Sequence, residues 1–268
     1  LLLGAGCGHT NTELVGGDLP QESVENIVIV AGNHANSKKA NYDCLDNVIE
    51  NVAIKYGNIC IIVNDGEPFI AADIQIPQQK AGLSSGKKKS IAQSQVIQIK
   101  DMLMADVCMA KTEGVDTVKS FELVERVLQS TRYLSGNTEV YVFDTGLSTK
   151  GIDFTQMNNN TYFPTIINEY VEKNSMNVNL KNVEVFWYGL CDVAKPQEHL
   201  SKRQKEIVKT VWTDYLCNSG AKFQFMSEIC TDDYTCELPE VQTIEVMTNS
   251  LFIDEYTYEE EVLSIPET

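Results

Sequence analysis

The sequence of 268 residues has little of what nucleic-acid-binding or membrane-spanning proteins use. Its 21 Lys and Arg stand against 38 Asp and Glu, which gives a formal net charge of −17. A surface this acidic repels phosphate backbones and anionic lipid headgroups. We therefore expect no nucleic-acid partner and no membrane binding through charge. No segment reaches the ~18 consecutive apolar residues that a membrane-spanning helix needs.

Metal-binding spacings of Cys and His are also missing. The eight cysteines form no C-x-x-C pair, and the three histidines lie far apart in the sequence. This pattern predicts no zinc or other transition-metal site. Cys230 and Cys236, six positions apart in a loop-like segment, are the one pair whose spacing suggests a disulfide.

Three short motifs resemble known sites but fail on spacing or context. "AGLSSGKKKS" has three residues between Gly82 and Gly86, where a phosphate-binding P-loop needs four, so we expect a basic loop over 78–90. "GAGCGH" near the N-terminus follows no strand, which a dinucleotide-binding loop requires. Ser148 has Lys150 where a nucleophile elbow has its second glycine. The sequence therefore supports no acyl-transfer triad.

The N-terminal stretch "LLLGAGCGHTNTE" begins with small and apolar residues that lead to Cys7. It resembles a bacterial lipobox, in which the cysteine is lipidated and the residues before it are removed. The polar residues that follow are typical of a tether. We therefore expect a lipobox remnant and tether over 1–24, with Cys7 lipidated and the protein outward-facing on the bacterial cell envelope. The alternative is a cytosolic chain that begins with an apolar strand.

Strand and helix patterns alternate through the middle of the chain. Continuous apolar runs such as "NIVIVAG" are typical of strands that are buried on both faces, and the segments between them have the apolar spacing of amphipathic helices. This alternation predicts an α/β fold: a doubly wound, mostly parallel sheet with one antiparallel edge hairpin strand and helices on both faces. We expect this domain over 25–228, followed by an acidic C-terminal extension over 229–268. The segment "VQTIEVM" could form a further strand. The expected strands are 26–32, 59–74 (a hairpin), 139–143, 183–189 and 221–225; the expected helices are 37–57, 91–110, 118–134, 161–173 and 201–217.

Two strand ends carry the polar residues that a binding site needs. "IVIVAGNHANS" and "VYVFDTGLSTKG" each run from a buried strand into a loop of small and polar side chains. In an open α/β sheet, ligands bind beyond the carboxyl ends of the strands where the strand order reverses. We therefore expect the two loops to share one crevice. The predicted ligand-binding residues are Asn33, His34, Ser37, Thr117, Asp144 and Ser148.

The order of elements over about 25–226 resembles that of the von Willebrand factor type A (VWA) domain. That family binds a metal ion with D-x-S-x-S after the first strand, a Thr before a middle helix and an Asp after the fourth strand. Here these positions fall on Asn33 to Ser37, on Thr117 (with Thr112 as an alternative) and on Asp144. The resemblance implies that Ser37, Thr117 and Asp144 could hold a metal ion. Asn33 and Ala35 replace a carboxylate and a hydroxyl ligand, so we expect Mg²⁺ or Ca²⁺ to bind weakly or not at all.

These features lead to three hypotheses for the function. The first is a surface-anchored, non-catalytic binding module that holds a protein or cell-envelope ligand in the crevice. The second is a metal-assisted hydrolase or phosphoryl-transfer enzyme that uses Asp144 with Asp65 or Asp116. The third is a structural component of an envelope assembly. No cofactor is expected beyond weakly bound Mg²⁺ or Ca²⁺, and the membrane is reached only through a lipid at Cys7.

Overall fold

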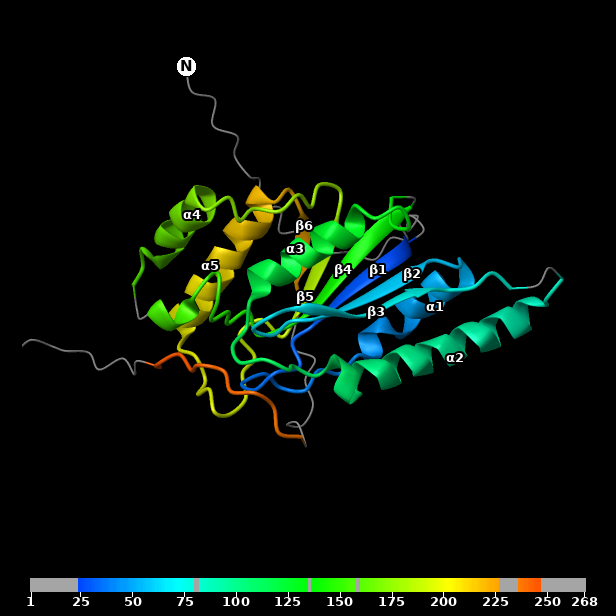
Figure 1. Ribbon diagram of the computed structural model, residues 1–268, viewed down its shortest axis with the longest axis horizontal. Helices are drawn as coiled ribbons and strands as arrows, with labels where there is room; N and C mark the ends of the chain where they lie inside the picture. The colour runs from blue at the N-terminus through cyan, green and yellow to red at the C-terminus, as the bar shows by residue number, and fades with distance from the viewer. Residues whose placement is uncertain (1–23, 80–81, 135, 158–159, 227–235, 247–268) are drawn as a thin grey trace, which may run out of the picture.

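A computed structural model of the chain describes residues 24–79, 82–134, 136–157, 160–226 and 236–246 (Figure 1). The expected lipidation site Cys7 and the expected disulfide partner Cys230 lie outside these residues. Among the described residues, no helix is both long enough and apolar enough to cross a membrane.

The described core is one six-stranded sheet in the order β3-β2-β1-β4-β5-β6. Neighbouring strands are parallel except for β2 and β3, which pair antiparallel as a hairpin. This is the strand order of a doubly wound fold, with its switch point between β1 and β4. The predicted fold class is therefore confirmed. The strands are β1 (Val24–Ala31), β2 (Asn58–Val63), β3 (Phe69–Gln75), β4 (Asn137–Phe143), β5 (Glu184–Tyr188) and β6 (Lys222–Phe225).

Helices cover both faces of the sheet (Figure 1). In β1, Ile27 and Ile29 pack towards α1 and α2, whereas Val28 and Val30 pack towards α3, α4 and α5. Because successive side chains of a strand point to opposite faces, a strand covered on both sides must be apolar at every position. This explains the continuous apolar run in the sequence. The helices are α1 (Asp46–Ile54), α2 (Ser85–Leu103), α3 (Thr117–Leu128), α4 (Phe163–Lys173) and α5 (Lys202–Asn218).

Two buried tryptophans hold the loop that follows β4. Trp187 and Trp212 are fully buried, with ring centroids 5.1 Å apart. The indole N–H of Trp187 donates to the backbone carbonyl of Asp144, and that of Trp212 donates to the carbonyl of Gly146, each at 2.8 Å. A buried indole N–H needs such a partner, so the core itself fixes the backbone at Asp144.

Several helix boundaries differ from the sequence-based expectation: α2 ends at Leu103 instead of residue 110 and α3 ends at Leu128 instead of residue 134, and two helix starts also differ. The helix α2 begins at Ser85, within the segment that was expected to be a loop, because the Ser84 side chain caps it by accepting from the Lys87 N–H. The helix α1 begins only at Asp46, so the loop after β1 is longer than expected. The Asp116 side chain caps α3 by accepting from the Lys119 N–H at 3.0 Å.

The described part of the C-terminal region, residues 236–246, is here called the strap. It has no helix or strand, so the possible strand in this region is not formed over 241–246. Val241 and Ile244 are nevertheless buried against the domain. The strap is thus attached to the α/β domain rather than separate from it. The Cys236 thiol within it is free and exposed.

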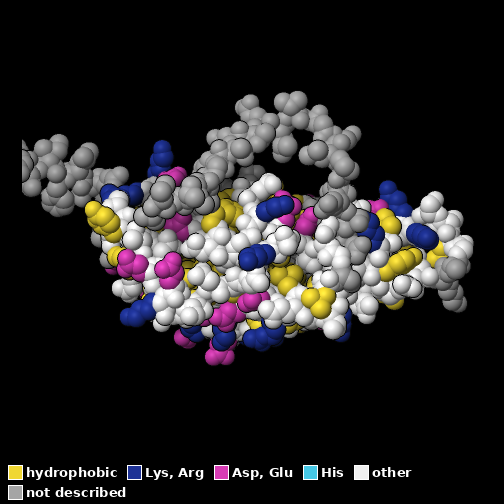
Figure 2. Space-filling view, turned by 90° about the horizontal axis from the view of Figure 1, so that it is seen from above, with side chains coloured by type: hydrophobic (Ala, Val, Ile, Leu, Met, Phe, Trp, Pro, Cys, Tyr) yellow, Lys and Arg dark blue, Asp and Glu magenta, His cyan; other side chains and the backbone are white. Residues whose placement is uncertain are grey.

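Charges of both signs are interspersed over the face that is seen from above in Figure 2, and apolar side chains occur there only in small groups. The strong net negative charge of the sequence is therefore not concentrated into one acidic patch on this face. Such a mixed surface is typical of a charge distribution that serves solubility.

Candidate functional site

The loops after β1 and β4 lie side by side at the carboxyl edge of the sheet, as expected. The N–H of Gly32 donates to the carbonyl of Phe143 at 2.7 Å and so continues the β1–β4 pairing into the loops. A Cβ at residue 32 would overlap the Asp144 carboxylate and the Phe143 carbonyl. Glycine at this position therefore lets Asp144 approach the first loop closely.

The centre of the crevice is a buried pair of His34 and Asp144. The Nε2 atom of His34 lies 2.8 Å from Oδ2 of Asp144, and both side chains are 0% exposed. The same Oδ2 accepts from the Asn64 amide at 2.9 Å, while Oδ1 accepts from the Gly146 N–H at 2.6 Å. Both oxygens of Asp144 are thus occupied by donors of the protein itself.

Both ring nitrogens of His34 lie against acceptors. Its Nδ1 atom is 2.9 Å from the Ala35 carbonyl and 3.1 Å from Oδ1 of Asn36, on the side opposite Asp144. Only the protonated ring can donate from both nitrogens. Burial alone would lower the pKa of His34, but the charge of Asp144 and the hydrogen bonds to Asp144, Ala35 and Asn36 together raise that pKa above 6.5. The geometry and the pKa agree on an imidazolium–carboxylate pair.

The side chains of Asn36, Asn64 and Ser120 belong to this network and were not among the predicted ligand-binding residues. Asn64 donates to Thr117 Oγ1 at 3.0 Å as well as to Asp144, and its own Oδ1 accepts from the Ser120 hydroxyl at 2.8 Å. Asn64 is the first residue after β2, which is the other neighbour of β1. A polar residue at the carboxyl end of a strand beside the switch point was the signal that could have identified it.

The side chain of Asn33 does not lie beside Asp144, contrary to the expected ligand set. Its amide donates to the carbonyls of Leu103 and Cys108 at 3.0 and 2.9 Å, and its Oδ1 accepts from the Tyr42 hydroxyl at 2.9 Å. These contacts tie the first loop to the end of α2. His34, the next residue, turns towards Asp144 instead, because neighbouring side chains in the loop point in different directions.

The hydroxyl groups of the two serines in the expected site form hydrogen bonds to backbone carbonyls of the loops. Ser37 Oγ donates to the Lys38 carbonyl at 3.2 Å. Ser148 is 0% exposed, and its hydroxyl lies within hydrogen-bonding distance of the Val115 and Lys150 carbonyls, at 3.0 and 2.7 Å. The structure therefore brings His34, Thr117 and Asp144 into one network and places Ser148 next to it.

A divalent cation does not fit this arrangement. Mg²⁺ and Ca²⁺ need several free oxygen ligands. Both oxygens of Asp144 are engaged, and Thr117 Oγ1 already accepts from Asn64. The His34 imidazolium also places a positive charge against the carboxylate that a cation would use. No group of three or more His, Cys, Asp or Glu among the described residues could hold a metal ion.

The carboxylates proposed as catalytic partners of Asp144 have other roles. Asp65 is 0% exposed, and its carboxylate accepts from the backbone N–H groups of Glu67, Lys111 and Thr112. Asp116 caps α3, and burial, the largest contribution, raises its pKa above the ordinary value. Neither carboxylate has a hydrogen bond to the His34–Asp144 network that would support a shared catalytic role.

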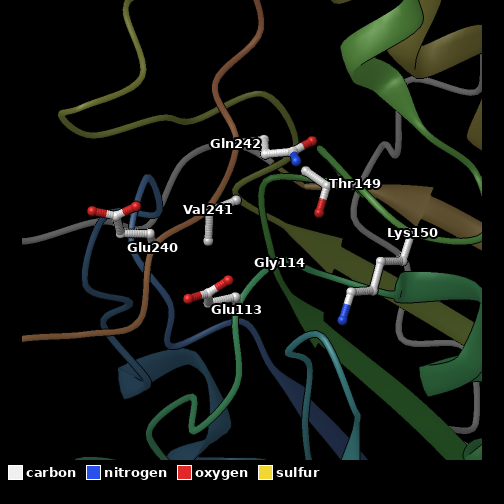
Figure 3. A pocket seen from close by; sticks show the side chains of 7 residues that line it. All are labelled: Glu113, Gly114, Thr149, Lys150, Glu240, Val241 and Gln242. Atoms are coloured by element: carbon white, nitrogen blue, oxygen red, sulfur yellow. The ribbon is translucent and has the colours of Figure 1, made fainter.

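The strap crosses the same edge of the sheet. The Gly114 N–H donates to the Glu240 carbonyl of the strap at 3.0 Å. A cavity of about 310 Å³ lies beside this hydrogen bond, and Glu113 of the domain and Glu240 of the strap both border it (Figure 3). A second cavity of about 170 Å³ separates the strap from the loop after β1. The expected crevice is therefore closed at its centre by His34 and partly covered by the strap.

The strand order, the antiparallel β3 hairpin and the two consecutive helices α2 and α3 together define a doubly wound α/β fold of the VWA type. The loops after β1 and β4, where the sequence resemblance implied a metal site, enclose a His–Asp pair. The fold is thus VWA-like, and the centre of its crevice is different.

No protein-family model and no curated protein matches the sequence. Three similar solved structures are a conserved hypothetical protein, BatB, from Bacteroides thetaiotaomicron, a von Willebrand factor type A protein from Catenulispora acidiphila, and the ArnB paralog VWA2 from Sulfolobus acidocaldarius. Their sequence identities to this chain are 12%, 9% and 11%, and the TM-scores are 0.39, 0.32 and 0.30. The alignments cover 76%, 76% and 77% of this chain and 91%, 38% and 42% of the respective structures.

The raised pKa of His34 predicts how stability depends on pH. A group with a raised folded-state pKa stabilises the fold fully below its unfolded-state pKa, here about 6.5, and loses this contribution as the pH rises through the folded-state value. We expect the free energy of unfolding to fall as the pH rises above 6.5. In His34→Gln, whose amide can still donate to Asp144 but carries no charge, this decline should disappear. Denaturant titrations at a series of pH values measure it.

The matched control is His199→Gln, which removes an exposed imidazole from the loop before α5 and should keep the decline of the wild type. His34→Leu, which leaves Asp144 buried without its counter-charge, should cost about 3–5 kcal/mol. A His34→Gln variant with the same pH dependence as the wild type would contradict the ion pair.

Donors of the protein occupy both oxygens of Asp144. We therefore predict that divalent cations have almost no effect on stability. Thermal melts in millimolar Mg²⁺, in Ca²⁺ and in EDTA should coincide, since even a ligand present near its dissociation constant adds only ~0.4 kcal/mol. Asn33→Asp should not create a site, because the new carboxylate would face the Leu103 and Cys108 carbonyls. We expect it to lower the melting temperature equally with and without Mg²⁺. Tight stoichiometric Mg²⁺ binding in calorimetry would overturn this.

Proposed function

We propose that this chain is a non-catalytic binding module that holds another protein, or a ligand of the cell envelope, with the loops at the carboxyl edge of its sheet. The observation that carries this proposal is the buried His34–Asp144 pair. It fills the centre of the crevice with two fully buried side chains, so the charges that a catalytic or metal site would use are neutralised within the protein. The surrounding loops remain as the surface that a partner would meet.

The loops around this centre are well suited to present a fixed surface. The Asp144 N–H donates to the Tyr188 carbonyl at 3.1 Å, and the Cys191 N–H donates to the Thr145 carbonyl at 2.8 Å. The Ala194 N–H reaches the Asn36 carbonyl at 2.8 Å, which ties the loops after β1, β4 and β5 together. Preorganised loops on a rigid sheet lose little entropy on binding, which favours recognition.

The enzymatic alternative would require a different use of Asp144. A hydrolase or phosphoryl-transfer enzyme needs a carboxylate that is open to substrate or metal, whereas this one is buried and bonded on both oxygens. The anchored location is part of the proposal and rests on the lipobox-like sequence before Cys7. An outward-facing lipoprotein on a bacterial envelope would present these loops away from the membrane.

The binding face is tested by photo-crosslinking in the native cell. A photoreactive residue in place of Glu113 or Lys195, both exposed and both on this face, should form covalent adducts with another protein. The matched control is Leu134, which is 69% exposed and lies just before β4, at the opposite edge of the sheet. We expect adducts from the first two positions and none from the third.

Equal adducts from all three positions would mean contact without a defined face, and no adducts from Glu113 or Lys195 would remove the proposed role. A positive result also requires that the same partner protein be found from both positions.

The envelope anchor is tested by mass spectrometry of the native protein. We expect a chain that begins at Cys7 and carries a diacylglyceryl group, and a Cys7→Ser variant that is released into the soluble fraction. A native chain that keeps residues 1–6 and has an unmodified Cys7 would end the anchor proposal without affecting the binding face.

A further inference from the structure

The strap is held by side chains that contact its backbone. The buried side-chain amide of Gln197 pairs with both backbone groups of Ile244: its Oε1 accepts from the Ile244 N–H at 2.6 Å, and its Nε2 donates to the Ile244 carbonyl at 2.9 Å. The amide of Gln204, 0% exposed, donates to the Glu245 carbonyl at 2.9 Å. Main-chain contacts of this kind do not depend on the sequence of the segment that is bound, as in other extended-peptide sites.

The side chains of the strap are buried at a regular interval. Val241 and Ile244 are 6% and 4% exposed, and Leu238, three residues earlier, is half-buried. Thr243 and Glu245, on either side of Ile244, are exposed. A repeat of three is the period of an extended polyproline-type segment, which needs no internal hydrogen bonds. The domain surface that the strap covers is here called the groove. It therefore accepts an extended chain with an aliphatic residue at every third position.

The strap adds nothing to the pairing of the sheet. It belongs to no strand, and its contacts with the domain are made to the Gly114 loop, the Gln197 loop and the start of α5. Glu240 of the strap and Glu113 of the domain border the same cavity, which Lys150 also lines (Figure 3). Because the strap contributes no strand, its displacement would leave every strand pairing of the described sheet in place.

From these contacts we propose that the groove beneath the strap is a peptide-binding site, and that residues 236–246 occupy it as a built-in competitor. Its ligand is an extended segment of a partner protein with aliphatic residues three positions apart. Gln197 and Gln204 form hydrogen bonds with the backbone of this segment. The inference rests on the proposed binding function and adds to it the chemistry of the ligand and its regulation. A tethered competitor acts at an effective concentration in the millimolar range, so only a better-matched or displacing ligand gains entry.

The proposal is tested with the full chain and a fluorescein-labelled peptide of residues 236–246 that carries serine in place of Cys236. Ile244→Asp puts a charge into the apolar cluster and should release the strap. Thr243→Asp adds the same charge at an exposed neighbour and serves as the matched control. In fluorescence anisotropy we expect the Ile244→Asp chain to bind the peptide at least tenfold more tightly than the wild type or Thr243→Asp.

The specificity of binding is checked by competition. The unlabelled peptide should displace the labelled one, and a peptide with both Val241→Asp and Ile244→Asp should not. A cooperatively folded Ile244→Asp chain that binds the peptide no better than the wild type would overturn the proposal, since the strap would then be a permanent part of the domain.

Hydrogen exchange of the unmodified wild type gives an answer even if Ile244→Asp fails to fold. The Ile244 and Gly114 amides, which make strap contacts, should exchange at least tenfold faster than the amides of β4. Exchange as slow as that of β4 would show that the strap opens only on global unfolding, and would overturn the proposal.

Three further outcomes separate this inference from related ones. Concentration-dependent wild-type dimers that the peptide dissociates would mean that a second copy supplies the segment, which overturns the assignment to a partner protein. Crosslinks from Glu113 and Lys195 without peptide binding by Ile244→Asp would remove the strap inference and leave the proposed function standing. Peptide binding by Ile244→Asp without crosslinks would remove the proposed function and, with it, the assignment of the groove's ligand to a partner protein.

Discussion

The buried pair of His34 and Asp144 is the interaction on which the rest of the crevice depends. An isolated carboxylate removed from water is costly, and it becomes tolerable only when a counter-charge and hydrogen-bond donors surround it. Here the counter-charge comes from the loop after β1, and the donors come from the Asn64 and Gly146 positions of two other loops. Each of these loops must keep its place, because moving any one would leave the carboxylate unsatisfied.

This arrangement has a consequence for the kind of site that the fold can offer. The carboxyl edge of the sheet brings polar residues of several loops together, and here the Asp144 carboxylate is paired with a cation of the chain itself, the His34 imidazolium. The charge is fixed within the chain and does not depend on metal supply. In the function that we propose, recognition is left to the outer loops and to the groove under the strap, where Gln197 and Gln204 contact a backbone rather than a charge.

The strap and the crevice are also linked through shared supports. The loop after β5 contributes Gln197 to the strap and, through the Ala194 N–H, supports Asn36, whose side-chain Oδ1 lies 3.1 Å from the His34 ring. The loop before α3 contributes Gly114 to the strap and leads into Thr117, which accepts from Asn64. The closed centre thereby helps to build the outer groove, and both parts lie at the one edge of the sheet where loops from many strands converge.

The sequence by itself determined the sheet and the location of the site. Continuous apolar runs had to be doubly covered strands, and parallel strands that flank a switch point had to bring the loops of Asn33–Ser37 and Asp144 together. It could not decide which loop side chain faces inward: Asn33 turns to α2 while His34 turns to Asp144, and only the packing of α2 and β4 sets that choice. Nor could it place the strap, which forms neither helix nor strand and is held by the loops that carry Gly114 and Gln197. Local patterns fix the elements because they depend on neighbours along the chain, whereas side-chain direction in loops depends on partners that the folded sheet alone brings into contact.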